Sequence, residues 1–246
     1  MSDYRQKFYS RYVSTYQKGL FEIENCEIIK KSFPVFHKYY VRHFPEDKGA
    51  SILELGCGNG AFLYYLQHLG YCNSYGIDIS QEQINIAKRI RVNNAEKADL
   101  REYLKDKKNS YDVIIGRDIL EHFSKNEIMD VLQLIYDSLK TGGMLIIQTP
   151  NGESPFSNRY RYCDITHEII FTRISLQQLL SVFDFKDVLC YRTGPVVYGL
   201  KSAVRFVLWR FIELFLKAYL LIESGTCEGV FTQNIICKAR KGDFAS

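Results

Sequence analysis

Closely spaced cysteine pairs are missing from this sequence. Its seven cysteines are scattered, odd in number and never spaced as Cys-x-x-Cys. This pattern argues against a disulfide framework or a zinc site, and it favours a reducing compartment. The first residues also lack the apolar run of a secretory signal, so the sequence predicts a cytoplasmic protein.

A strong excess of charge of either sign is also missing. The formal net charge is +4 at pH 7, which gives no reason to expect nucleic acid as a partner. Internal repeats and low-complexity linkers are absent from the sequence as well. A chain of 246 residues with 46% apolar content can bury one substantial core, so we expect a single domain over residues 1–246.

What the sequence does contain is an alternation of predicted strands and helices. Residues 1–45 are aromatic and basic, with apolar residues at helical spacing, and this predicts a helical cap. Within 46–150 we expect strands at 51–55, 74–79, 95–98, 111–115 and 143–149, and helices at 60–69, 81–91 and 125–139. Short connections between such elements imply parallel strands and right-handed crossovers.

The alternation breaks after residue 150. Residues 151–182 contain an irregular polar loop and then a short helix at 175–182, and 183–246 contain the closing elements. These are strands at 187–192 and 230–238, separated by an apolar helix at about 199–222. The expected fold is therefore α/β, a doubly wound, mostly parallel seven-stranded sheet with insertions after strand five and between the last two strands. Because ligands of such sheets bind beyond the carboxyl ends of the strands, the polar loop is the expected substrate-binding region.

The segment Ile52–Gly60 has the pattern of a buried strand, a tight glycine turn and a helix start. This is how α/β proteins hold a nucleotide-like ligand. Asp78 ends the following strand, where a carboxylate can accept hydrogen bonds from ribose hydroxyls. Gly56-x-Gly58-x-x-Ala61 also fits the dinucleotide-binding motif. From these residues alone, a nicotinamide-dependent dehydrogenase is therefore an open alternative. Glu54, inside the first strand, and Asp99, after the third, weigh against that alternative.

Four segments together resemble one family. The run Glu54–Gly60 resembles motif I of the class I S-adenosylmethionine-dependent methyltransferases, and Asp78 is similar to their ribose-binding acid. Ala98–Leu100 resembles the adenine-side segment, and Arg117–His122 resembles the motif after strand four. The resemblance covers about residues 50–150 and the closing strands. It implies a Rossmann-like methyltransferase fold, with S-adenosylmethionine as cofactor and S-adenosylhomocysteine as product.

In that family, the position of Glu54 lies near the methionine amino group of the cofactor, and that of Asp78 binds both ribose hydroxyls. The resemblance thus implies a complete cofactor site. Its expected members are Glu54, Gly56, Cys57, Gly58, Gly60, Asp78, Ile79, Gln83, Ala98, Asp99, Leu100, Arg117, His122 and Tyr12.

Two histidines fall in the expected crevice, His122 after strand four and His167 in the loop after strand five. Histidine can remove a hydroxyl proton at neutral pH, and Asp164 is placed to fix the tautomer of His167. We therefore expect His167, Asp164 and His122 to be catalytic. A purely structural loop is the alternative interpretation.

A divalent cation is a further expectation at the same place. On a helical turn Asp118, Glu121 and His122 would face one way, since residues three and four apart are neighbours. Such a set, with His167 added, could hold a metal ion. With Asp118 in place of a glutamate, it resembles the metal-binding motif of the ubiquinone-pathway O-methyltransferases. A role in shaping the cofactor pocket is the competing interpretation.

The polar loop carries a second resemblance. The stretch from Thr149–Asn151 through Asp-x-Thr-His-Glu to Phe-Thr-x-x-Ser-Leu resembles a subgroup tied to bacterial surface-polysaccharide synthesis. It implies O-methylation of a sugar, nucleotide-sugar or phosphate-bearing precursor of capsule or O-antigen. Alternatives are a small-metabolite methyltransferase, of quinone type or directed to an amino group, and an inactive binding subunit of the same fold. The expected substrate residues, with arginines suited to an anionic group, are Asn151, Arg159, Tyr160 and Arg161.

The apolar segment 199–222 is interrupted by five charged residues, which argues against a membrane span. It would pack on the protein's own core, form a dimer face, cover the active site or lie on a membrane surface. The expected partners are therefore a small-molecule or glycan-precursor acceptor and no nucleic acid. Peripheral membrane contact stays open, and the chain would be a monomer or a homodimer.

Overall fold

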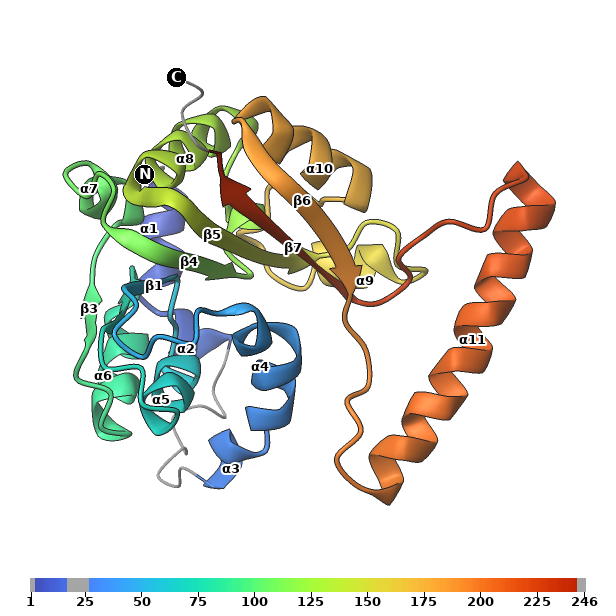
Figure 1. The fold of residues 1–246 in the computed structure, drawn as a ribbon, viewed down its shortest axis with the longest axis horizontal. Helices are drawn as coiled ribbons and strands as arrows, with labels where there is room; N and C mark the ends of the chain where they lie inside the picture. The colour runs from blue at the N-terminus through green and yellow to red at the C-terminus, as the bar shows by residue number, and fades with distance from the viewer. Residues whose placement is uncertain (1–2, 17–26, 243–246) are drawn as a thin grey trace.

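The computed structural model describes residues 3–16 and 27–242. Seven strands form one sheet in the order β3-β2-β1-β4-β5-β7-β6 (Figure 1). They are β1 (Ile52–Leu55), β2 (Ser74–Asp78), β3 (Ala95–Lys97), β4 (Tyr111–Arg117), β5 (Leu139–Pro150), β6 (Phe185–Arg192) and β7 (Asn234–Lys241). Neighbours from β3 through β5 are parallel, whereas β7 runs antiparallel to both β5 and β6. The doubly wound, mostly parallel seven-stranded fold predicted from the sequence is confirmed.

Helices cover both faces of the sheet. The described helices are α1 (Asp3–Tyr9), α2 (Tyr12–Thr15), α3 (Glu27–Lys30), α4 (Phe33–Tyr39), η2 (Val41–His43), α5 (Ala61–His68), α6 (Gln81–Arg89), α7 (Leu100–Leu104), η3 (Leu120–His122), α8 (Lys125–Ser138), α9 (Ser157–Arg161), α10 (Arg173–Val182) and α11 (Leu200–Ser224). Because strand side chains alternate between faces, Ile52 packs in one core with α4, α5 and α6, and Leu53 packs in the other with α7, α8 and α10.

The path of the chain creates a crevice beside β1. The chain runs outward through β2 and β3 and then returns to β4 on the other side of β1. The carboxyl ends of β1 and β4 therefore lie next to each other at the point where the strand order reverses, which is where open α/β sheets bind their ligands.

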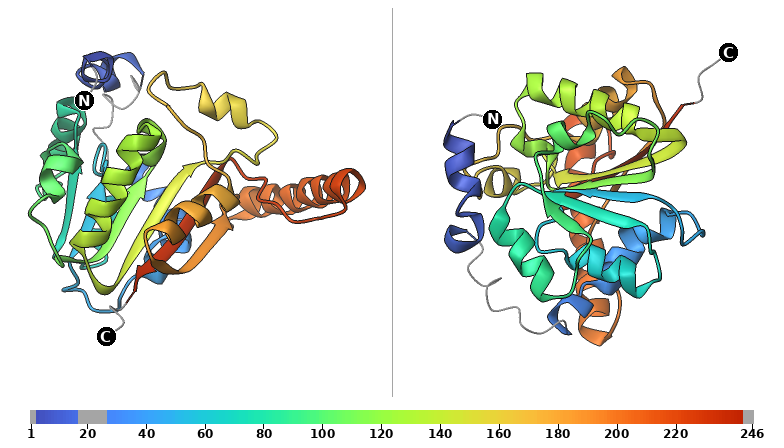
Figure 2. Two further views of the ribbon diagram at one scale, coloured as in Figure 1. Left: turned by 90° about the horizontal axis from the view of Figure 1, so that it is seen from above. Right: turned by 90° about the vertical axis from the view of Figure 1, so that its left-hand side faces the viewer.

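The helical cap expected over residues 1–45 has two parts, and residues 17–26 of it lie outside the described structure. The first part, α1 and α2, lies at the same end of the sheet as the segment containing α9 (Figure 2). The second part, α4, packs on α5, where the rings of Phe36 and Phe62 meet with centroids 5.3 Å apart. Among the described residues of the cap, those on the wall of the crevice belong to the first part.

Two features of the closing region differ from expectation. Cys190 and Cys237 are directly opposite on β6 and β7 and are joined by a disulfide, which corrects the expectation of unpaired cysteines. Sequence spacing could not reveal this pair, because antiparallel strand register brings together residues 47 positions apart. The second feature is α11, which stands away from the body (Figure 1). None of the described helices has the length and hydropathy that a membrane crossing needs.

Candidate active site

A cavity of about 370 Å³ opens at the carboxyl ends of the strands. It is lined by residues of α1, α2, the glycine loop, the ends of β2 and β4, η3 and the loop after β5. Of the expected cofactor residues, those lining it are Gly56, Gly58, Asp78, Ile79, Gln83, Ala98, Asp99, Leu100, Arg117, His122 and Tyr12. Glu54, Cys57 and Gly60 are not on its wall. The sequence motifs thus converge on one cavity.

The glycine loop fixes the carboxylate of Asp78. The backbone N–H of Gly58 donates to Oδ2 of Asp78 at 2.9 Å, and the N–H of Ser80 donates to Oδ1 at 2.8 Å. Burial raises the pKa of Asp78, while these two N–H bonds oppose that shift. Gly60 has φ of +74°, and a Cβ there would lie 2.9 Å from Cβ of Ala87. The loop therefore needs glycine, and each Asp78 oxygen keeps a lone pair for a ligand hydroxyl.

Glu54 lies behind Arg117 rather than on the cavity wall. Its side chain is fully buried, and Oε1 accepts bonds from Arg117 Nε at 3.0 Å and Nη2 at 2.6 Å. Burial raises the pKa of Glu54, and the Arg117 guanidinium opposes the shift. That guanidinium also lies 5.0 Å from the ring centroid of Phe62. A buried carboxylate needs a paired cation, so the structure has Arg117, not Glu54, facing the ligand space.

Asp99 lines the cavity but is already engaged by protein donors. It caps α7 by accepting from the backbone N–H of Arg101, and the Arg101 guanidinium donates to both carboxylate oxygens. Burial alone would raise the pKa of Asp99, but the bonds from Arg101 leave it lowered. Asp99 therefore caps α7 and also places a carboxylate on the cavity wall.

A hydrogen-bond chain fixes the tautomer of His122. Thr166 Oγ1 lies 2.7 Å from Asp164 Oδ1 and 2.8 Å from His122 Nδ1. Bonds from Tyr12 and Thr166 overcome the effect of burial and lower the pKa of Asp164, so its carboxylate accepts the hydrogen bond that the Thr166 hydroxyl donates. Thr166 Oγ1 must then accept from Nδ1–H of His122. The lone pair of this imidazole is therefore on Nε2.

Burial and the neighbouring His167 lower the pKa of His122 to about 4. The imidazole is thus neutral at neutral pH, and its side-chain hydrogen bond with Thr166 uses Nδ1. The side chain is only 7% exposed and lines the cavity. His122 is therefore a desolvated base whose free nitrogen is available to a ligand.

The expected pairing of Asp164 with His167 is wrong. Both oxygens of Asp164 are used by Thr166 and by Tyr12, whose hydroxyl donates at 2.6 Å. His167 instead has Nδ1 3.1 Å from the carbonyl oxygen of Tyr160, which requires a proton on that nitrogen. Asp164 folds back onto the residue two positions later, as Asp commonly does in turns, and so supports His122 through Thr166.

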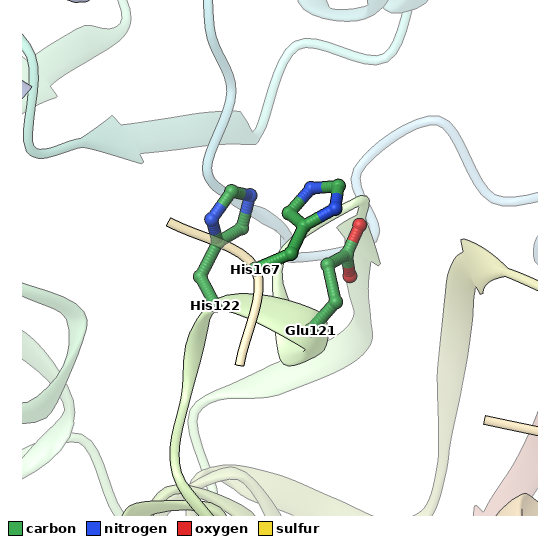
Figure 3. A group of neighbouring side chains, drawn as sticks. All are labelled: Glu121, His122 and His167. Carbon is green, nitrogen blue, oxygen red and sulfur yellow. The ribbon is translucent and has the colours of Figure 1, made fainter. Parts of the chain in front are cut away.

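The acidic cluster after β4 also differs from expectation. Asp118 has φ of +54° and accepts from Gln148 at 2.8 Å, and the short helix η3 begins after it. Asp118, Glu121 and His122 therefore do not share one helical turn. Glu121, His122 and His167 do come together, with candidate ligand atoms within 4.8 Å of one another, and Figure 3 shows the three side chains directed to one side.

Among the expected substrate residues, only Tyr160 lines the cavity. Arg159 and Arg161 lie outside it on α9. Asn151 is fully buried, and its side-chain amide donates to the carbonyl oxygens of Val230 and Thr232. β7 begins at Asn234 rather than at the expected residue 230.

Sequence reasoning missed the contribution of α1. Arg5, only 6% exposed in its side chain, donates to Glu127 at 2.8 Å and to Glu168 at 3.0 Å. Burial raises the pKa of Glu127, but bonds from Ser124 and Arg5 bring it down to about 2. Arg5 and Tyr9 both line the cavity. The aromatic, basic composition of the N-terminal residues was a signal for their place on the cavity wall, whereas Thr166 appeared only as one position of a loop motif.

A family model described as a methyltransferase domain matches residues 32–189. Among curated proteins, O-methyltransferase 3 of Dictyostelium discoideum is 27% identical over 168 residues, which are 58% of this chain and 38% of that relative. This chain thus spans well under half of that relative's length.

Solved structures of similar fold include a SAM-dependent methyltransferase from Archaeoglobus fulgidus. Its TM-score is 0.63 at 23% identity, covering 88% of this chain and 95% of that chain. Another is phosphoethanolamine N-methyltransferase 2 of Haemonchus contortus in complex with S-adenosyl-L-methionine, with a TM-score of 0.61 at 14% identity, covering 96% and 60%. At these identities the likeness shows the fold.

Proposed function

This chain belongs to the methyltransferase-domain family, and we propose that it transfers the methyl group of S-adenosylmethionine to a hydroxyl oxygen of a small, sugar-bearing acceptor. Family membership confirms the methyltransferase class expected from the sequence. The observation that carries the oxygen acceptor is the chain from Asp164 through Thr166 to His122, which leaves a neutral imidazole nitrogen free at the cavity.

The residues present fit this cofactor. A volume of about 370 Å³ lies in the range of about 300–1,000 Å³ common for small-molecule sites. Asp78 would accept from the ribose hydroxyls, since its backbone bonds leave one lone pair on each oxygen. Ile79 and Leu100 would cover the adenine, and the Arg117 guanidinium suits the methionine carboxylate. When bound, the cofactor supplies an electrophilic methyl group on a positively charged sulfur.

The protein's part in the reaction is to position the acceptor and take its proton. With the acceptor held in line with the methyl group that the cofactor would supply, Nε2 of His122 would take the hydroxyl proton of the acceptor. Thr166 holds the ring with Nδ1–H directed away from the acceptor. Asp164 stabilises the imidazolium as it forms.

A row of tyrosines supports a sugar-bearing acceptor. The rings of Tyr9 and Tyr12 have centroids 5.9 Å apart, those of Tyr12 and Tyr16 5.5 Å, and all three line the cavity. Such rings offer apolar faces to pack on and hydroxyls for hydrogen bonds. The wider assignment to surface-polysaccharide synthesis stays a prediction from the sequence.

A product-mass screen tests this proposal. Purified protein is incubated with S-adenosylmethionine and panels of nucleotide sugars, phosphorylated sugars and amino compounds. We expect a hydroxyl compound to gain the mass of one methylene. His122→Ala should form much less of this methylated product. Methylation of amino compounds alone would overturn the oxygen acceptor, and failure to bind S-adenosylhomocysteine by calorimetry would overturn the cofactor assignment.

A second candidate role for the same side chains is binding of a divalent cation. Glu121 is fully buried, and neither carboxylate oxygen has a hydrogen-bond partner among the described residues. Burial and nearby Asp118 raise its pKa well above the usual range. A cation held by Glu121, His122 and His167 would satisfy this carboxylate, but it would occupy the nitrogen that acts as base. Loss of turnover with a chelator, restored by metal, favours this role, and indifference to chelator rejects it.

A further inference from the structure

Helix α11 presents a broad apolar surface to the outside of the molecule. Of its 25 residues, only Ser202 and Glu213 are buried. Figure 1 shows the helix apart from the body and joined to it by extended segments. Its exposed large apolar side chains are Leu200, Val204, Val207, Leu208, Phe211, Ile212, Leu214, Phe215, Tyr219, Leu221 and Ile222. So much exposed apolar surface marks an interaction site.

The helix has a defined inner side. Glu213 accepts from Arg192 of β6 and from Arg210 one turn earlier, and the ammonium of Lys38 lies 5.8 Å from the ring centroid of Phe206. At about 100° per residue, Phe211 lies about 160° from Glu213. The contacts with the body therefore turn Phe211 and Phe215, which are 67% and 72% exposed, toward the outside.

The charges on α11 point to the chemistry of its partner. At about 100° per residue, Lys201 and Arg205 lie about 80° and 120° to one side of Phe211, and Arg210 and Lys217 about 100° and 120° to the other. Basic residues thus border both sides of the outer apolar surface. Glu213 is turned inward and paired, which leaves Glu223 in the last turn as the only acidic residue of α11 that is exposed.

We propose that the outer surface of α11 lies on an anionic lipid membrane. A wide apolar surface with lysine and arginine along both borders is the pattern of helices that lie in a membrane interface. Long basic side chains can bury their stems and reach the lipid headgroups. A second copy of α11 would bring like charges together along its borders, and a two-helix seam uses a narrower apolar stripe.

Vesicle co-sedimentation of the full chain tests this inference. Wild-type protein should bind phosphatidylcholine vesicles containing about one third phosphatidylglycerol, and should bind pure phosphatidylcholine vesicles at least about fivefold less. Phe211→Asp with Phe215→Asp should lower binding to the anionic vesicles by more than about tenfold. Lys201→Ala with Arg205→Ala should remove much of the preference for anionic lipid.

The matched control is Ile174→Asp with Val182→Asp, which changes exposed apolar residues on α10 (65% and 61% exposed) and should leave vesicle binding unchanged. Circular dichroism and thermal unfolding confirm that each variant folds. Equal loss in the control, or no vesicle binding by folded wild-type protein, overturns the proposal. A dimer in light scattering that Phe211→Asp dissociates, without vesicle binding, assigns the surface to a second copy and also overturns it.

Discussion

We assign one half of the cavity, around Gly58 and Asp78, to the cofactor, and the other half, around Tyr12, Asp164 and His122, to the acceptor. The two halves are built in different ways. The cofactor half rests on backbone geometry, because the glycine loop and the ends of β1 and β2 are close in sequence and Asp78 is held by two N–H groups. The acceptor half is assembled from side chains of distant segments, since Tyr12 bonds Asp164 across 152 positions and His122 bonds Thr166 across 44. A site held by backbone can be recognised from a motif, whereas a site held by distant side chains cannot.

The largest effect is expected in the cofactor half. Asp78→Ala removes the carboxylate that would accept both ribose hydroxyls and releases the Gly58 N–H. We expect affinity for S-adenosylhomocysteine to fall by more than about a hundredfold, from two charge-assisted hydrogen bonds of about 1.5–3 kcal/mol each. Isothermal calorimetry measures this, with Asp106→Ala at an exposed position as control. If Asp78→Ala keeps the wild-type affinity for S-adenosylhomocysteine, Asp78 does not bind the ribose and this half of the cavity is not the cofactor half.

In the acceptor half, Thr166→Val should separate turnover from cofactor binding. Valine keeps the shape but cannot fix Nδ1–H of His122, so kcat should fall by about ten- to a hundredfold, while S-adenosylhomocysteine affinity stays within about twofold. Thr166→Ser should restore most of the activity because it returns the hydroxyl. A parallel fall in cofactor affinity would mean that Thr166 supports the whole cavity rather than His122.

The pH dependence of turnover provides a second test of the acceptor half. The base must be neutral, and the pKa of His122 is about 4, so kcat should be flat from pH 8 to 6 and should fall as pH approaches 4. An ordinary histidine would instead lose activity below about pH 6.5. Steady-state rates across this range, with circular dichroism to confirm folding at each pH, distinguish the two cases.

A smaller effect is expected from Arg5→Ala, which releases α1 from the acceptor half. Losing the ion pairs with Glu127 and Glu168 should lower kcat/KM by about tenfold, since partly buried pairs contribute about 1–2 kcal/mol. Limited trypsin cleavage near Lys7 should also become faster. Arg11→Ala, an exposed position on the same segment, is the control and should change neither quantity.

The smallest effect is expected from the arginines of α9. Arg159→Ala and Arg161→Ala should change kcat/KM by less than about twofold, because neither side chain lines the cavity and exposed charges contribute little. A tenfold loss of kcat/KM for a phosphorylated acceptor would show that α9 closes over the acceptor, and would restore the substrate role expected from the sequence.

The sheet was largely predictable, and so was the convergence of Gly56, Gly58 and Asp78 on one cavity, because these residues carry their constraints in local sequence. That this cavity holds the cofactor stays a prediction. The role of Glu54 was not predictable, since its partner Arg117 is 63 positions away.

The prediction that Asp118 shares a helical turn with Glu121 and His122 was wrong, because Asp118 has a left-handed backbone conformation. Residue spacing alone does not reveal that conformation. Thr166 stayed hidden because a threonine beside two better candidates gives no signal until the loop folds back.

The position of β7 has a consequence for how the chain folds. This strand pairs with both β5 and β6, yet it is the last of the seven in chain order. Until it inserts, β5 has an unpaired edge and β6 has no partner strand in the sheet, and unpaired strand edges invite pairing with other chains. Pairing of β7 with β5 also requires contacts between residues 84 (Pro150 and Asn234) to 96 (Met144 and Arg240) positions apart, which slows folding. Aggregation during refolding should therefore depend on how fast β7 pairs with β5 and β6.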